Sequence, residues 1–129
     1  MPLTTAGAEF IANAITNNGT PTFFDSTNAY IAVGSGVTAF NIAQTTLVTE
    51  ITATDGRKLV DSAPGVVGGD ITMIGTYGTG DANDTWAEWG IFNDPTPDTG
   101  VMLSRKVEAL GTKTSAQSWQ ITVTLSVTA

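Results

Sequence analysis

The residues of this chain that could do acid–base chemistry are carboxylates, hydroxyls and lysines, because its 129 residues include neither histidine nor cysteine. Without these two residue types, a Ser–His–Asp hydrolase, a thiolate nucleophile and the usual zinc sites are excluded. Cleavage of a sugar by carboxylates needs two acids that face each other across a cleft. Glu88, within TWAEWGIF (85–92), is the one acid in a clearly apolar predicted strand, and the sequence places no second acid opposite it.

Glu88 has a candidate partner of opposite charge in Arg105, which lies in the next apolar segment, VMLSRKV. If the turn-rich NDPTPDTG closes a hairpin with Phe92 opposite Val101, Glu88 lies directly opposite Arg105, and a slip of two residues makes the pair diagonal. A cross-strand partner of opposite charge lets a half-buried carboxylate stay ionised. We therefore predict that Glu88 and Arg105 form a structural charge pair, and that Glu88 is not a catalytic base.

Four aromatic residues are predicted to lie in the core. In an extended strand Trp86 and Phe92 share one face, whereas Trp89 points to the other. Trp119 begins the clearest alternation in the chain, QSWQITVTLSVTA, in which apolar and polar side chains give one dry face and one wet face. Each of these aromatic side chains therefore stands on a face that the fold can bury.

Two short motifs could bind ligands but are better explained as turns. GSGVTA (34–39) follows an apolar stretch, as a dinucleotide-binding loop does, but the helix, the acidic residue and the parallel βαβ setting that such a loop needs are missing. GDANDT brings Asp81 and Asp84 together, but a calcium loop of the helix–loop–helix type would need a glutamate where Phe92 stands. A hairpin turn explains this motif better, and a weak surface cation at Asp81 and Asp84 stays open. We expect no cofactor.

One helix is predicted, over about residues 5–16 (TAGAEFIANAIT). Thr4 or Thr5 can cap its N-terminus, and apolar residues recur along it at helical spacing. The asparagines, glycine and proline of NNGTP (17–21) end it.

From about residue 29 onward the chain reads as strands and turns. About seven short strands, separated by turn signals and without helical stretches between them, indicate a mainly β fold. We therefore expect an antiparallel β-sandwich or barrel with one N-terminal helix. The length fits a single β-domain spanning residues 1–129, because no linker or repeat divides the chain.

The charge balance argues against two classes of partner. Twelve acidic and five basic residues give a net charge of −7, which disfavours nucleic-acid backbones and anionic membranes. No stretch is long and apolar enough for a transmembrane helix, and no secretory signal is visible. Only 13% of the residues are charged, about half the usual share, whereas threonine occurs 23 times. Such a surface is typical of β-rich proteins that are packed in an assembly.

Four segments, taken together, resemble small structural proteins of tailed bacteriophages. They are LTTAGAEFIANAI, AYIAVGSGVTAF, TWAEWGIFN and GVMLSRKVEALGTKTSAQSWQITVTLSV. Their order and spacing are similar to the short N-terminal helix, the glycine-ended strand, the EWG strand and the alternating C-terminal strand of that group. The resemblance extends from Leu3 to Val127, and EWGIFN with MLSRKV is its most specific part.

The resemblance implies a virion structural protein and not an enzyme. Similar domains also stand at the head of tail-fibre and collar proteins, where a fibre shaft follows. No shaft follows here, so we expect a capsid decoration or cement protein that clamps neighbouring major capsid subunits and stabilises the head shell. The alternative is a tail, baseplate or fibre-attachment adaptor.

The same resemblance implies where the protein acts and what it binds. We expect it in the virion, after synthesis in the host bacterial cytoplasm. Its expected partners are the major capsid protein or other virion proteins, and no nucleic acid or membrane. It implies a homo-oligomer, with a trimer favoured.

Overall fold

The computed structural model describes residues 2–53 and 55–127 of the chain. One helix, α1 (Thr5–Ile15), precedes seven strands. The strands are β1 (Tyr30–Gly34), β2 (Arg57–Leu59), β3 (Gly65–Val67), β4 (Asp70–Tyr77), β5 (Thr85–Phe92), β6 (Met102–Thr112) and β7 (Trp119–Ser126). The predicted single domain also includes residues 1, 54 and 128–129, which lie outside the described part of the chain.

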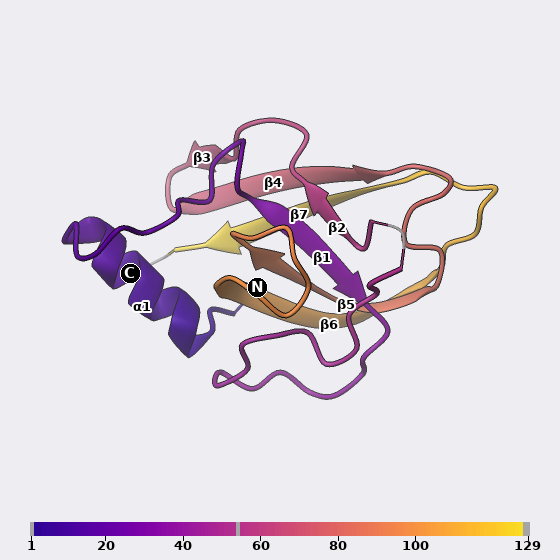
Figure 1. Ribbon diagram of the computed structural model, residues 1–129, viewed down its shortest axis with the longest axis horizontal. Helices are drawn as coiled ribbons and strands as arrows, with labels where there is room; N and C mark the ends of the chain where they lie inside the picture. Colours follow the sequence, from indigo (N-terminus) through magenta and orange to yellow (C-terminus); the bar gives the residue numbers. More distant parts are fainter. Residues whose placement is uncertain (1, 54, 128–129) are drawn as a thin grey trace.

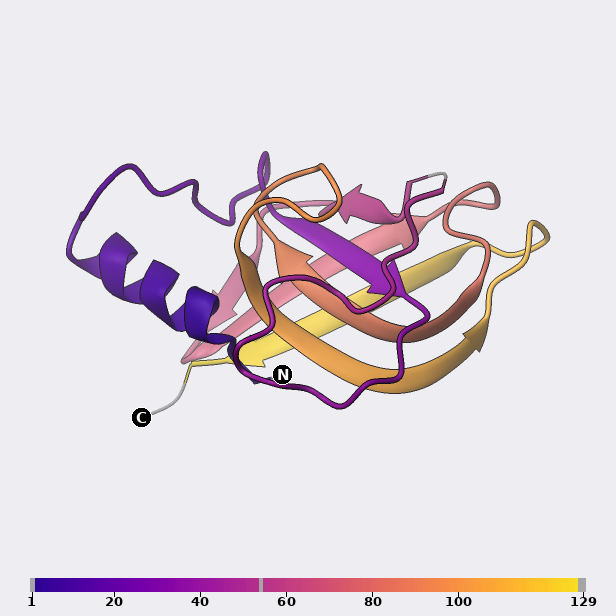
Figure 2. The ribbon, with the colours of Figure 1, turned by 60° about the horizontal axis from the view of Figure 1, so that its bottom comes forward.

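The strands form two antiparallel sheets that pack face to face. One sheet has the strand order β2–β1–β5–β6, and the other has the order β3–β4–β7. The main apolar core takes side chains from both sheets. Figures 1 and 2 show helix α1 at one end of this sandwich. The prediction of a mainly β, antiparallel fold with one N-terminal helix is therefore confirmed, as two sheets and not as a closed barrel.

Helix α1 begins after Thr4, which both caps the helix and joins it to β6. Thr4 Oγ1 accepts a hydrogen bond from the Gly7 N–H at 2.9 Å and donates one to the Met102 carbonyl. Of the two predicted caps, the structure uses Thr4 and not Thr5. Gly7 lies so close to β6 that a Cβ at this position would clash with the Leu103 carbonyl oxygen. A small residue and a hydroxyl thus set the position of the helix.

The apolar side of α1 is only partly covered by the rest of the protein. Phe10 and Ile11 are half-buried, whereas Ile15 is 79% exposed. The Phe10 ring meets the Phe24 ring edge-on, with the ring centroids 5.0 Å apart. The helix therefore leaves apolar surface open at its end of the sandwich. Among the described residues, no helix is long and apolar enough to cross a lipid bilayer.

Of the four predicted core aromatic residues, Trp86 packs on a different face from that expected. Trp86 and Trp89 are buried in the main core, where the Trp86 ring meets the half-buried Trp119 ring at 5.0 Å. Phe92 is fully buried in a separate small cluster. The prediction that Trp86 and Phe92 share a face is wrong, because the register of β5 against β6 shifts between Trp86 and Glu88.

Replacing Thr4 by alanine is expected to lower the free energy of unfolding by about 1–2 kcal/mol, because the variant loses the helix cap and the buried bond to Met102. Thr5→Ala, at the exposed next position, is the matched control and is expected to cost less than ~0.5 kcal/mol. Urea denaturation of both variants measures the difference. Equal losses would show that Thr4 does not hold the helix in place.

Candidate functional site

Glu88 and Arg105 form a fully buried ion pair. Arg105 Nε donates to Glu88 Oε2 at 2.8 Å, Arg105 Nη2 lies 2.6 Å from the same oxygen, and neither side chain is exposed to solvent. Glu88 also accepts the backbone N–H groups of Val48 at 3.1 Å and Thr49 at 2.7 Å. The structure thus brings the two predicted partners together. The carboxylate of Glu88 is enclosed by donors from the protein, which leaves no approach for a substrate.

The ion pair is diagonal, and the predicted direct pairing across the hairpin is wrong. Phe92 lies opposite Met102, and Glu88 lies opposite Val107, so Arg105 stands two positions from the place predicted for it. One position of the shift arises because the hairpin closes with Phe92 opposite Met102 and not Val101, and the other arises from the irregularity between Ile91 and Phe92. The pair still forms, because a diagonal neighbour remains within reach of a long side chain.

The ion pair also attaches a long loop to the sheet. Besides Glu88, Arg105 bonds Gln44 Oε1 at 3.1 Å and the Thr38 carbonyl at 3.0 Å. These bonds and the backbone bonds to Glu88 hold the segment 35–50, which runs from the end of β1 across the sheet (Figure 2). The loop therefore supplies part of the polar environment that the buried charges need.

The glycines of the GSG motif make room for this carboxylate. A Cβ at Gly34 would lie 2.5 Å from Glu88 Oε1, and a Cβ at Gly36 would lie 2.7 Å from the same atom. Only glycine lets the backbone pass so close to Glu88. The motif ends β1 and leads into the loop, with no helix directly after it. A dinucleotide-binding loop is therefore not what these glycines form.

Arg57 makes a second buried arrangement, which the sequence analysis missed. Its guanidinium bonds both carboxylate oxygens of Glu50, at 2.9 and 3.0 Å, and stacks on the Phe92 ring at 3.7 Å from the centroid. It also bonds the carbonyls of Asp94 and Thr99, at 2.8 and 3.1 Å. Arg57 thus joins β2 to the loop between β5 and β6. The sequence feature that could have indicated this site is the Arg–Lys dipeptide, because it occurs in both segments that carry a buried arginine.

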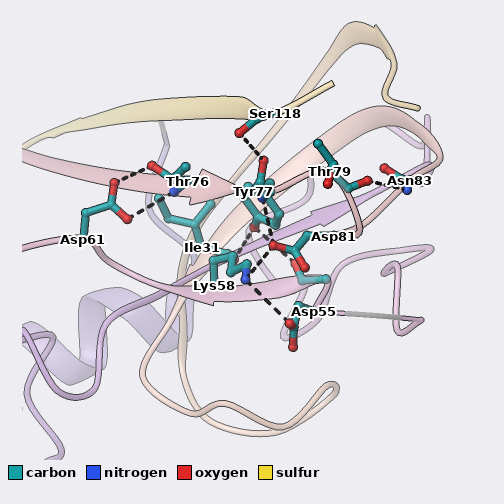
Figure 3. A network of polar contacts seen from close by, with 12 residues as sticks. Ile31, Asp55, Lys58, Asp61, Thr76, Tyr77, Thr79, Asp81, Asn83 and Ser118 are labelled. Atoms are coloured by element: carbon teal, nitrogen blue, oxygen red, sulfur yellow. Dashed lines mark hydrogen bonds and ion pairs between the residues drawn. The ribbon is translucent and has the colours of Figure 1, made fainter. Parts of the chain in front are cut away.

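The acidic motif GDANDT is organised around Asp81 (Figure 3). Asp81 Oδ2 accepts Lys58 Nζ at 2.7 Å and the Gly78 N–H at 2.8 Å. The bond from Lys58 lowers the pKa of Asp81 below its ordinary 3.8 and raises the pKa of Lys58 above its ordinary 10.5. Asp84 accepts the Thr85 N–H instead, at 2.7 Å. No group of three or more acidic side chains in the described ranges is arranged to hold a metal ion.

Two buried polar side chains close this end of the sandwich. The Tyr77 hydroxyl donates to the Ile31 carbonyl at 2.7 Å (Figure 3), and burial raises the pKa of the phenol well above its ordinary 10. Lys113, only 1% exposed, donates to the Gly78 carbonyl at 2.6 Å and to Asn83 Oδ1 at 2.8 Å. In the part of the chain that the structure describes, every buried polar side-chain atom has a hydrogen-bond partner. These polar groups therefore hold the strands and loops together.

An apolar groove of ≈ 380 Å³ opens at the other end, beside helix α1. The residues that line it come from α1, the segment before β1, and strands β3, β4 and β6. They include Phe10, Ile11, Phe24, Val66, Ile71 and Met73. Val66 is 68% exposed, so the groove is continuous with open apolar surface. Such a surface is typical of a binding site for another protein.

One carboxylate without a basic partner lines the apolar groove, and three more lie close in sequence to its lining residues. Asp25 lines it, and Glu9, Asp61 and Asp70 are exposed and within two residues of lining residues. Among the described residues, none of these four acids takes part in an ion pair. The basic residues of the chain are buried or paired with other acids. The groove therefore suits an apolar segment flanked by lysine or arginine.

Comparisons with known proteins add no family to this geometry. No protein-family model matches the chain, and no curated protein matches it. The case for a function therefore depends on the residues and on the contacts between them.

Arg105→Ala is expected to lower the free energy of unfolding by about 3–5 kcal/mol, because it leaves Glu88 as an unpaired buried charge. Lys106→Ala is the matched control. The Lys106 side chain is 47% exposed and pairs with Glu108 at 3.2 Å, so its loss is expected to cost under ~1 kcal/mol. Urea denaturation compares the two variants. Equal losses would contradict the structural role of the buried pair.

Asp81→Asn is expected to flatten the dependence of stability on pH in acid. Since the pKa of Asp81 is below 3.8 in the folded protein, its ion pair stabilises the fold above about pH 4, and this contribution is lost as the pH falls further. Urea denaturation at a series of pH values measures the slope. In a Lys58→Met background the same substitution is expected to change the slope much less. An unchanged slope in the wild-type background would show that the pair is not coupled to folding.

Proposed function

We propose that this chain is a structural protein of a tailed-bacteriophage virion, and that it binds the capsid as a decoration or cement protein. The resemblance of its helix, EWG strand and C-terminal strand to phage structural proteins supports this role. So does the composition, because a surface rich in threonine and poor in charge suits a protein packed in an assembly.

The observation that carries the proposal is the apolar groove with the carboxylate of Asp25 in its lining. An open apolar surface on a protein with a satisfied polar interior marks a site for another protein. The groove can take apolar side chains of a capsid subunit, and Asp25 can pair with a lysine or arginine beside them. Contacts of this kind add binding free energy where capsid subunits meet.

The buried carboxylates support a role in binding and not in catalysis. A catalytic acid or base must come within hydrogen-bond reach of its substrate. Glu88 and Glu50 are instead enclosed by Arg105 and Arg57, and their task is to hold loops to the sheet. We therefore assign the protein no reaction, and we propose that it works by adding contacts to the shell.

The proposal includes the setting in which the protein acts. It is made in the bacterial cytoplasm and carried in the virion, with the major capsid protein as its partner. It assembles with copies of itself, and the resemblance favours a trimer. The alternative role, an adaptor of the tail, baseplate or fibre attachment, uses the same groove on a different neighbour.

Co-sedimentation with capsids that have been stripped of the protein tests the proposal. The purified chain is expected to pellet with assembled capsids and not with free capsid subunits. Val66→Asp, which places a charge in the groove, is expected to reduce the bound fraction by about tenfold or more. Val37→Asp, at a similarly exposed valine of the loop after β1, is the control and is expected to bind like the wild type.

The same assay separates the two roles and can reject both. Binding to purified tails alone would support the adaptor role and contradict the capsid role. Binding to neither capsids nor tails would contradict a virion function. Equal binding of the Val66→Asp and Val37→Asp variants would show that the groove is not the contact.

A further inference from the structure

Strand β7 (Trp119–Ser126) is an unprotected edge of the β3–β4–β7 sheet. It pairs with β4 along its whole length, without a register shift, and no other strand among residues 2–53 and 55–127 pairs with its other side. Its sequence, WQITVTLS, contains no charged residue and no proline. Edge strands of soluble proteins are usually short, charged, bulged or covered, because an open edge is a template for another strand. Strand β7 has none of these protections.

The other edge strands of the two sheets are protected. Strands β2 and β3 are only three residues long. Strand β6 carries Lys106 and Glu108, its register is irregular, and the N-terminal segment covers its first part through a bridge between Leu3 and Ser104. The difference between β7 and these strands marks β7 as the edge that is open to pairing.

The backbone groups that β7 offers can be identified from the bonds it already makes. The N–H of Val127 donates to the Gly69 carbonyl at 2.7 Å, at the end of the ladder between β4 and β7. Hydrogen-bonded pairs alternate along an antiparallel ladder, so the odd-numbered residues of β7 bond β4. The N–H and C=O groups of the even-numbered residues therefore point outward. These residues are Gln120, Thr122, Thr124 and Ser126, and all four are exposed.

Strand β7 has a hollow at one end and an exposed apolar side chain at the other. The hollow, of ≈ 380 Å³, is lined by the apolar Trp86, Leu110, Trp119 and Ile121 and by the polar Ser118, Gln120 and Thr122. Beyond the last residue of the strand, the side chain of Val127 is 42% exposed. Val127 has the same odd-numbered phase as Trp119, so both stand on the same face of the sheet.

We propose that β7 pairs with β7 of a second copy of this chain, antiparallel and about a two-fold axis that passes through Val123. In this register Thr122 of one copy lies opposite Thr124 of the other, and the outward backbone groups of the two strands bond each other. Apolar positions face apolar positions, and Val127 of each copy enters the hollow beside Trp119 of the other. The two three-stranded sheets then join into one continuous sheet.

The strand's chemistry explains why the occupant is a second copy. A two-fold contact must be self-complementary, and the hollow and the exposed valine meet this condition because each copy supplies one of each. Pairs of threonines directly opposite each other are favourable across strands, and no like charges are opposed. This inference depends on β7 alone and is independent of the virion role. It gives a dimer, whereas the resemblance implies a trimer.

Sedimentation velocity of the purified chain between roughly 1 and 100 µM tests the pairing. The wild type is expected to sediment as a dimer at the higher concentrations. Thr122→Lys combined with Thr124→Lys places lysine opposite lysine at both positions, and it is expected to weaken association by about tenfold or more. Both side chains are exposed on the outer face, so the monomer is expected to keep its circular dichroism spectrum and melting temperature.

A charge reversal at one position is the matched control. Thr122→Lys combined with Thr124→Glu places opposite charges face to face in the proposed register, so this variant is expected to remain dimeric. In a register shifted by two residues, the lysine at position 122 or the glutamate at position 124 would meet its own copy and repel it. A monomeric or trimeric wild type, or equal association of the two double variants, would overturn the proposal.

Discussion

The buried ion pair between Glu88 and Arg105 is the constraint to which most of this fold is adapted. Two charges removed from water are costly unless each is paired and its remaining hydrogen-bonding groups are satisfied. Here the loop after β1 supplies these hydrogen bonds: the Thr49 N–H donates to Glu88, and the Thr38 carbonyl accepts from Arg105. The loop is held by the charges, and the charges are tolerated because of the loop. Gly34 is part of the same solution, since a side chain there would meet the carboxylate.

The same use of charge recurs across the molecule and shapes its surface. Arg57 bonds Glu50 and two loop carbonyls, and Lys113 is buried against a carbonyl and an amide oxygen. Most of the few basic side chains are buried, so most of the exposed acidic side chains have no basic partner. A net charge of −7 is thus concentrated on the outside of the protein. In the proposed role, this charge favours a partner that carries positive charge as well as an apolar segment.

Two open surfaces remain once the polar network is satisfied, and they differ in kind. The groove beside α1 offers apolar side chains and the carboxylate of Asp25, which suits an apolar partner segment with a basic residue. The edge of β7 offers backbone groups and threonines without any charge, which suits a strand like itself. In the two proposals, one fold thus presents a contact for a different protein at the groove and a contact for its own copy along β7.

The sequence by itself determined the element types and the partners of the central ion pair. Alternation along β7, the helical spacing before Asn17 and the isolated charges in two apolar strands are local patterns, and each follows from the period of the backbone. The tertiary structure decided the register, which side of the sheet each aromatic residue faces, and the bond between Arg57 and Glu50. Register depends on irregular pairing between strands, and Glu50 reaches Arg57 only because a loop returns to the sheet. The strand register joins distant parts of the chain. Glu50 and Arg57 are close in sequence, but an irregular loop connects them, so no periodic pattern encodes their contact.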